Sequence, residues 1–145
     1  MRVLIQQVSQ AQVKVNDEEI SRIDKGLLVF LAVKHDDEIK VCQKMAQKIA
    51  KLRIFEDENN KMNLSVLDIK GELLVVSQFT LYGDTSSGNR PSFMESAVAE
   101  KAHKYYLQTI KDLRALGLSV KSGQFQKQMQ VNLINYGPKT IIIDL

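Results

Sequence analysis

The chain has 145 residues, a length that fits one domain with one hydrophobic core, and we expect residues 1–145 to form it. Its longest apolar runs are far shorter than the roughly 20 residues that a membrane helix needs. The single cysteine, Cys42, excludes an internal disulfide and fits a reducing compartment, so we expect a cytoplasmic protein that does not enter a membrane. The net charge of +3 would help a polyphosphate ligand approach, but many proteins with no nucleic-acid role share such an excess.

The first half of the chain predicts several strands and one helix. Gly26–Val33 is apolar throughout, which favours a strand buried on both faces. From Ile39 to Leu52 an apolar residue recurs every three or four positions, which predicts a helix whose start Asp36 or Asp37 could cap. Shorter strands, rich in β-branched residues, are expected at Arg2–Val8, Gln10–Val15 and Glu19–Ile23.

The second half predicts a long helix between β-rich segments. The helix runs roughly from Glu95 to Leu116 and follows a polar loop, Tyr82–Pro91, of a length that is often functional. Strands are expected at Arg53–Phe55, Glu72–Phe79, Met129–Asn135 and Thr140–Asp144. Because the strands are spaced irregularly between helices, we predict an α/β fold with mixed or antiparallel β-sheets. These would form a barrel-like or layered β-β-α core covered by two helices.

The motifs of the common hydrolases and nucleotide-binding proteins are absent. The chain has no G-x-S-x-G elbow, no phosphate-binding glycine loop and no H-E-x-x-H pair. His35 follows a strand and His103 is expected on the polar face of the long helix, so a Ser-His-Asp triad is hard to assemble. One cysteine and two histidines cannot fill a tetrahedral zinc shell, and we expect no metal and no cofactor.

Two polar clusters in apolar surroundings are the candidate sites. Ser77-Gln78-Phe79-Thr80 ends an apolar run, and backbone N–H groups that leave the sheet there could face an oxyanion. On physical grounds alone, side chains that merely satisfy a strand end explain this cluster better. The second cluster, Asn135–Thr140, contains Gly137-Pro138, which can hold two carbonyls rigidly toward a ligand. A turn between the last two strands is the simpler explanation there.

Together the two clusters resemble the D-aminoacyl-tRNA deacylase family. Its members carry an SQFTL-type motif and, near the C-terminus, an N-x-G-P-x-T motif, which are Ser77–Leu81 and Asn135–Thr140 here. The resemblance extends over essentially the whole chain. Further matching segments are Gly26–Val29, Leu52–Asp57, Gly88–Phe93 and Met129–Val131.

The resemblance implies a DTD-like fold and hydrolysis of the ester that joins a D-amino acid to the 3′-terminal adenosine of tRNA. It implies a homodimer with active sites at the interface, where the Gly-Pro pair of one subunit, in cis geometry, enters the other's pocket. Its carbonyls then occupy the space that an L side chain would need. Catalytic positions would be Ser77, Gln78, Phe79 and Thr80, and whether Thr80 is a nucleophile or positions the substrate stays open. Substrate-binding or chirality-selecting positions would be Gln7, Met129, Asn135, Gly137, Pro138 and Thr140.

Three positions depart from the family pattern. Gln7 stands where the family usually has Arg, Gln126-Lys127 where it has Gly-Ala, and Lys139 where it has Val. An amide cannot replace a planar guanidinium clamp, so we expect the Gly137–Pro138 loop to be held differently, and the trans isomer is one form it could take. Alternatively, Lys127 and Lys139 could have joined a phosphate-binding surface.

Two other functions stay open at this point. One is an aminoacyl-tRNA deacylase with relaxed stereospecificity, which also acts on glycyl or small L-aminoacyl esters. The other is a dimeric tRNA-binding protein that has lost catalysis. The intact SQFTL sequence favours a working enzyme.

Overall fold

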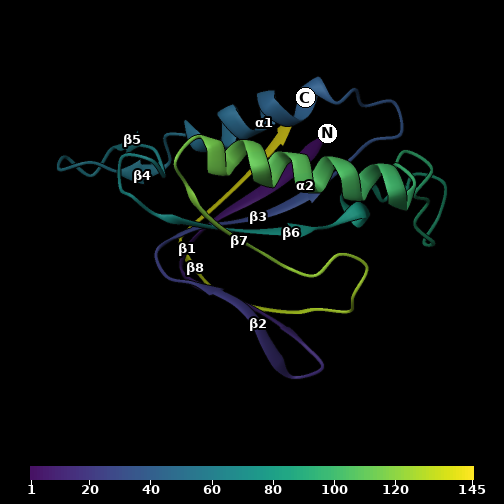
Figure 1. The fold of residues 1–145 in the computed structure, drawn as a ribbon, viewed down its shortest axis with the longest axis horizontal. Helices are drawn as coiled ribbons and strands as arrows, with labels where there is room; N and C mark the ends of the chain where they lie inside the picture. The colour runs from purple at the N-terminus through teal and green to yellow at the C-terminus, as the bar shows by residue number, and fades with distance from the viewer.

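The computed structural model describes all 145 residues as one mixed sheet, a small hairpin and two α-helices (Figure 1). The six strands of the sheet are β1 (Arg2–Val15), β2 (Glu18–Ile23), β3 (Gly26–Ala32), β6 (Glu72–Ser77), β7 (Ser119–Ser122) and β8 (Gln130–Asp144). The other elements are α1 (Lys40–Ala50), the hairpin β4 (Phe55–Glu56) and β5 (Met62–Leu64), the 3-10 helix η1 (Phe79–Tyr82) and α2 (Ala99–Ala115). The predicted α/β class is confirmed. Neither helix is long and apolar enough to cross a membrane.

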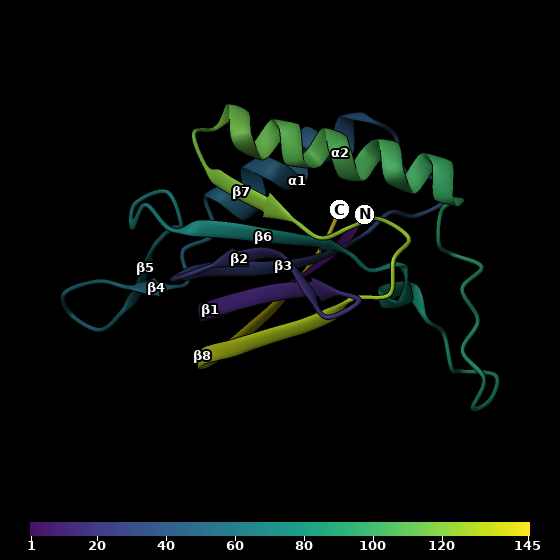
Figure 2. The ribbon, with the colours of Figure 1, turned by 60° about the horizontal axis from the view of Figure 1, so that its bottom comes forward.

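The long strand β1 organises the sheet. One edge of β1 pairs antiparallel with β8, and the other pairs first with β3 and then with β2. Beyond β3, the strands β6 and β7 continue the sheet in parallel. The sheet curls until β2 touches β7, where the Ser21 hydroxyl donates to the Ser122 carbonyl over 3.0 Å (Figure 2). This gives the barrel-like form that the sequence predicted.

Apolar side chains pack on both sides of β3 and β6. The larger core lies between the sheet and the two helices and includes Leu27 and Val75. A smaller core on the other side, enclosed by the curl of the sheet, includes Leu28 and Val76. Neighbouring residues of one strand are therefore buried in different cores, which confirms that Gly26–Val33 is covered on both faces.

Several predicted boundaries are wrong for physical reasons. The two strands expected at each end of the chain are continuous, because β1 and β8 stay paired with each other as they bend. The helix α1 begins at Lys40 without a side-chain cap. Asp37 does not cap it, because its carboxylate accepts hydrogen bonds from the Met1 ammonium and the Lys34 N–H, each over 2.7 Å.

Both helices begin near the end of β3. The segment before α2 runs beside the end of β3, where the Ala97 N–H donates to the Val33 carbonyl over 2.9 Å. Both helices therefore begin at the edge at which the parallel strands β3 and β6 end (Figure 1). Residues that follow parallel strands gather at such an edge, which makes it the natural position for a site.

Candidate active site

The predicted motif begins where β6 leaves the sheet. Ser77 is the last residue of the strand, and the Gln78 N–H still donates to the Leu31 carbonyl over 2.8 Å. The chain then turns into η1. The strand therefore ends before Phe79, although the sequence predicted that it would reach this residue. Within the turn, Gln78 Nε2 donates to Thr80 Oγ1. The motif thus forms a compact corner in which the hydroxyl of Thr80 fixes the direction of the Gln78 carboxamide.

This corner forms one wall of a cavity of about 660 Å³. The other walls come from the start of α2 and from the segment that connects β7 to β8. Ser77, Gln78, Phe79 and Met129 of the predicted site residues face it, whereas Thr80 is not part of its lining. The full lining is Val76, Ser77, Gln78, Phe79, Ala97, Ala99, Ala102, Phe125, Gln126, Lys127, Gln128, Met129 and Val131.

The cavity contains almost no ionisable groups. Lys127 is the only lysine, and neither a carboxylate nor a histidine is among the lining residues. His103 lies just outside and is exposed as expected, and its ring stacks on that of Phe125 with 4.5 Å between the centroids. A reaction in this cavity must therefore depend on positioned amides, hydroxyls and backbone groups rather than on a side-chain base.

The connecting segment is fixed to the sheet at one carbonyl. The Val75 carbonyl accepts hydrogen bonds from the Gly123 N–H over 3.0 Å and from the Tyr106 hydroxyl over 2.8 Å. Burial raises the pKa of Tyr106 to about 12, so this phenol keeps its proton at ordinary pH. A Cβ on Gly123 would lie 2.7 Å from Met129 Sδ, which shows how closely the two ends of the segment approach.

The second predicted cluster forms a bulge in β8. Pairing with β1 is interrupted between Gln6–Thr140 and Val8–Asn135, and Tyr136–Lys139 project opposite Gln7. We call Tyr136–Lys139 the Gly-Pro bulge. The Gly137–Pro138 peptide bond is cis, so the trans form that the departures left open is wrong. Gln7 is only 3% exposed, and its Oε1, like Asn135 Oδ1, has no hydrogen-bond partner.

Contacts other than those of Gln7 hold the bulge. Lys139 Nζ lies 2.8 Å from Glu56 Oε1, which connects the bulge to the β4–β5 hairpin. Thr140 Oγ1 accepts hydrogen bonds from Gln6 Nε2 and Asn135 Nδ2, each over 3.3 Å. Because Lys139 is paired and only 16% exposed, it is not free to bind phosphate, and Lys127 is the lysine of the two that faces a cavity.

A sequence model described as D-Tyr-tRNA(Tyr) deacylase matches residues 4–144. The chain belongs to this family. Proteins named D-aminoacyl-tRNA deacylase from Thermotoga petrophila and Clostridioides difficile are each 51% identical over 144 residues, which is 99% of this chain and 97% of theirs. The solved structure named c-Myc DNA Unwinding Element Binding Protein matches with a TM-score of 0.94 and 38% identity, covering 100% of this chain and 99% of that one.

A second solved structure, titled as a probable eukaryotic D-amino acid tRNA deacylase, has a TM-score of 0.88 and 19% identity, covering 99% of this chain and 98% of its own. At that identity it shows a shared fold. The family and the DTD-like fold predicted from the two motifs are both confirmed.

In this member of the deacylase family the two motifs lie far apart on different strands of the sheet. Gln7, which faces the bulge, is in the same row as Leu73 through Leu27. Ser77 is four residues further along β6, about 13 Å, and three strand spacings of about 5 Å separate the strands sideways. The bulge therefore does not line the cavity of its own chain, and none of its residues is among the lining.

The cavity walls that sequence reasoning missed carry weak signals. Ala97 lies just before α2, Ala99 and Ala102 lie on its first turn, and such alanines look like ordinary helix residues. Phe125 was the one recognisable signal, because it is an isolated aromatic residue in a polar segment.

Proposed function

We propose that the protein hydrolyses D-aminoacyl-tRNA in the cytoplasm and releases free D-amino acid and tRNA. The observation that carries the proposal is the cavity in which Ser77, Gln78 and Phe79 of the family motif face the segment around Met129. Membership of the deacylase family and half-identical relatives of the same length support the same reaction.

The chemistry follows from what the cavity contains. An aminoacyl ester is already activated, so a positioned water and stabilisation of the oxyanion suffice. The Gln78 carboxamide, which Thr80 orients, would donate a hydrogen bond to the oxyanion. The Phe79 N–H would donate a second one, because Phe79 is the first residue of η1 and its N–H has no acceptor within that helix. This assigns Thr80 a positioning role. The cavity has no side-chain base, so the 2′-hydroxyl of the substrate's ribose would take part in the proton transfer.

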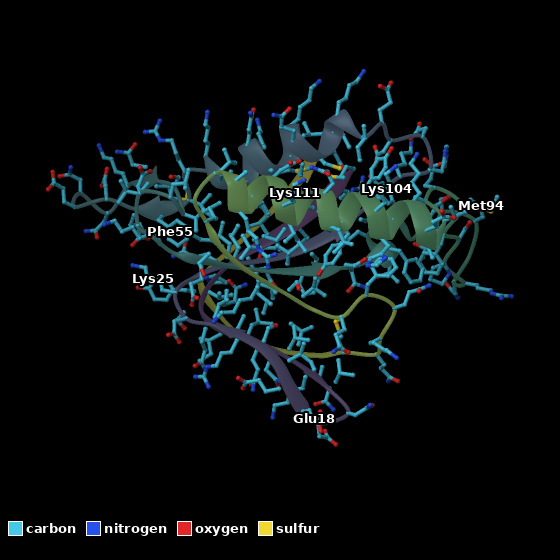
Figure 3. All side chains as sticks on the ribbon, in the orientation of Figure 1. Glu18, Lys25, Phe55, Met94, Lys104 and Lys111 are labelled. Carbon is cyan, nitrogen blue, oxygen red and sulfur yellow. The ribbon has the colours of Figure 1, made fainter.

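Selection between D and L substrates needs the Gly-Pro bulge, and we assign the bulge to the cavity of a second copy of the chain. The separation within one chain supports this assignment, because neither half can complete the other. Apolar residues exposed near the cavity also support it: Phe79 and Met94 are 54% and 84% exposed, and Met94 projects outward in Figure 3. In β8, Tyr136 and Ile142 are 55% and 61% exposed. A C2 dimer would cover such patches and build two equal sites.

The test mixes two variants that are defective in different halves. Gln78→Ala removes the carboxamide from the cavity, and deletion of Gly137–Pro138 removes the tip of the bulge. Each variant alone should lose hydrolysis of D-aminoacyl-tRNA or its preference over the matched L ester. After the variants are mixed in equal amounts, unfolded and refolded together, half of the dimers are mixed and each has one complete site. About one quarter of the wild-type selective activity should return.

The outcomes separate the alternatives. No recovery on mixing would contradict a site shared between two chains. Wild-type release of both the D and the L amino acid would support relaxed stereospecificity. If the wild type binds charged tRNA and releases neither amino acid, the protein is a binding module and the proposed reaction is wrong.

A further inference from the structure

The basic residues of the chain are concentrated on one helix. Lys40, Lys44, Lys48, Lys51 and Arg53 follow one another within fourteen residues, and no acidic residue lies between Ile39 and Phe55. The whole chain has 20 basic and 17 acidic residues, so the remainder has 15 basic against 17 acidic and is slightly negative. The positive excess of the protein therefore belongs to α1 and the residues just after it.

These side chains are exposed, and four of the five, Arg53 included, form no ion pair. Lys40 pairs with Glu38 over 2.7 Å, whereas no ion pair contains Lys44, Lys48 or Lys51. Other lysines next to carboxylates do pair, as Lys34 and Lys121 show. Like charges three or four residues apart repel each other on a helix, so lysines at this spacing favour an anionic ligand between them.

The same three lysines line a shallow groove. Lys44, Lys48, Lys51 and Arg53 surround it, together with Gln47, Leu52 and Leu145. Four residues of an α-helix advance about 6 Å, so the ammonium groups form an extended row rather than a single point. A row of cations along a groove fits a polyanion with regularly repeated charges, and a single small anion would use only part of it.

The helix also lies suitably for a ligand whose end occupies the cavity. Both α1 and α2 cover the same side of the sheet and begin at the edge at which β3 and β6 end (Figure 1). The start of α2 forms a wall of the cavity, and α1 packs beside α2. The row of lysines therefore leads away from that edge along the outer surface of the helices.

We propose that the groove formed by Lys44, Lys48, Lys51 and Arg53 is a docking surface for the phosphate backbone of the substrate tRNA. This inference rests on the proposed function, which supplies a ligand that is both long and strongly negative. The cavity binds the aminoacylated 3′ end, and α1 binds phosphates of the same molecule at a distance from the reaction. The groove contributes affinity without sequence preference, because phosphate contacts carry no information about bases.

The test compares two triple variants with the same net charge. Lys44→Gln, Lys48→Gln and Lys51→Gln neutralise the row and keep residues with a high helix propensity. The control, Lys25→Gln, Lys61→Gln and Lys70→Gln, neutralises three exposed lysines elsewhere, of which Lys25 is labelled in Figure 3. Binding of uncharged tRNA is measured over a range of salt concentrations, and both variants are checked for an unchanged Tm.

The row variant should bind tRNA about tenfold or more weakly, with a plot of log K against log salt that is shallower by about two to three. The control should stay close to the wild type. Equal weakening in both variants would show that only total charge matters and would overturn the inference, as would an unchanged slope in the row variant.

A second substrate separates this inference from the proposed function. A D-aminoacyl ester of adenosine alone has the reacting bond and no phosphate backbone. The wild type and the row variant should hydrolyse it at the same rate. Failure of the wild type would contradict the reaction itself, and slower hydrolysis by the row variant alone would show that α1 supports the cavity rather than docks RNA.

Discussion

At the scale of single residues, Lys139 connects the bulge to the rest of the protein. Lys139 Cγ would lie 2.7 Å from a Cβ on Gly137, so the lysine stem fills the place of a side chain at that position. Its ammonium then reaches Glu56 of the hairpin at 2.8 Å. Lys139 therefore lies against Gly137 within the bulge and pairs with the hairpin outside it.

We expect Lys139→Met to weaken the choice between D and L substrates. The variant keeps most of the stem and removes the ion pair, which contributes less than about 1 kcal/mol because Glu56 is 43% exposed. Loss of the ion pair cannot change the free energy of the bulge conformation by more than this amount. The ratio of kcat/KM for the D ester to that for the L ester should therefore fall by no more than about fivefold.

Lys40→Met is the matched control, because it removes an exposed ion pair with Glu38 that lies away from the bulge. Its D over L ratio should equal that of the wild type. Exchange of the two charges, Glu56→Lys with Lys139→Glu, should restore the ratio if the pair acts by holding the bulge. An unchanged ratio in Lys139→Met would contradict this role.

At the scale of elements, the pairing of β3 with β6 depends on a close backbone approach. Gly26 faces Glu72 at the start of both strands, and a Cβ on Gly26 would lie 1.9 Å from the Glu72 carbonyl oxygen. No rotation of a side chain relieves this overlap, because the obstructing atom belongs to the backbone.

Gly26→Ala should therefore destabilise the protein by about 3 kcal/mol, since β3 and β6 must move apart where their pairing begins. Urea unfolding followed by circular dichroism measures the loss. Lys25→Ala, at the exposed neighbouring position, should change the unfolding free energy by less than about 0.5 kcal/mol. A variant of Gly26 as stable as Lys25→Ala would show that the two strands can shift at no cost.

Some of the helices and strands could be predicted from the sequence, and others could not. Apolar periodicity placed both helices and the buried strand β3, because those patterns depend on local burial. The strand β7 was missed because only Val120 among its four residues is buried, which leaves no pattern to read. The bends of β1 and β8 depend on which strand pairs with each half of β1. The residues of those partner strands lie elsewhere in the chain, so the local sequence does not reveal the bends. Physical reasoning found both motifs, but only the family resemblance made them a candidate site.

At the scale of the whole molecule, the connecting segment ties the cavity to the stability of the fold. The hydroxyl of Tyr106 donates to the Val75 carbonyl beneath the segment, and the ring is 2% exposed. Burial raises the pKa of this phenol from 10.0 to about 12. The folded protein therefore holds the proton of Tyr106 at a pH at which the unfolded chain has lost it.

The sign of the pH dependence follows. Stability from the neutral Tyr106 is fully present below pH 10.0 and is lost as the pH rises toward about 12. At pH 11 the wild type has lost about 1 kcal/mol of unfolding free energy through the ionisation of Tyr106 in the unfolded chain. Tyr106→Phe has no phenol and does not show this loss. At pH 8 the same variant should be about 1 kcal/mol less stable than the wild type, because its hydrogen bond is gone.

Urea unfolding of both proteins at pH 8 and pH 11 measures these differences, and the comparison removes the titration of all other groups. The gap between wild type and Tyr106→Phe should narrow at the higher pH. A gap that is equal at both pH values would contradict a protonated buried phenol.

The separation of the bulge from the cavity has a consequence for dimers that contain two different chains. In the proposed dimer, the cavity of one chain hydrolyses the ester and the bulge of the other selects the chirality of the amino acid. Neither property therefore belongs to a single polypeptide. A hybrid of this chain with a relative would contain two unlike sites. Each site would take its chemistry from one parent and its stereochemical preference from the other.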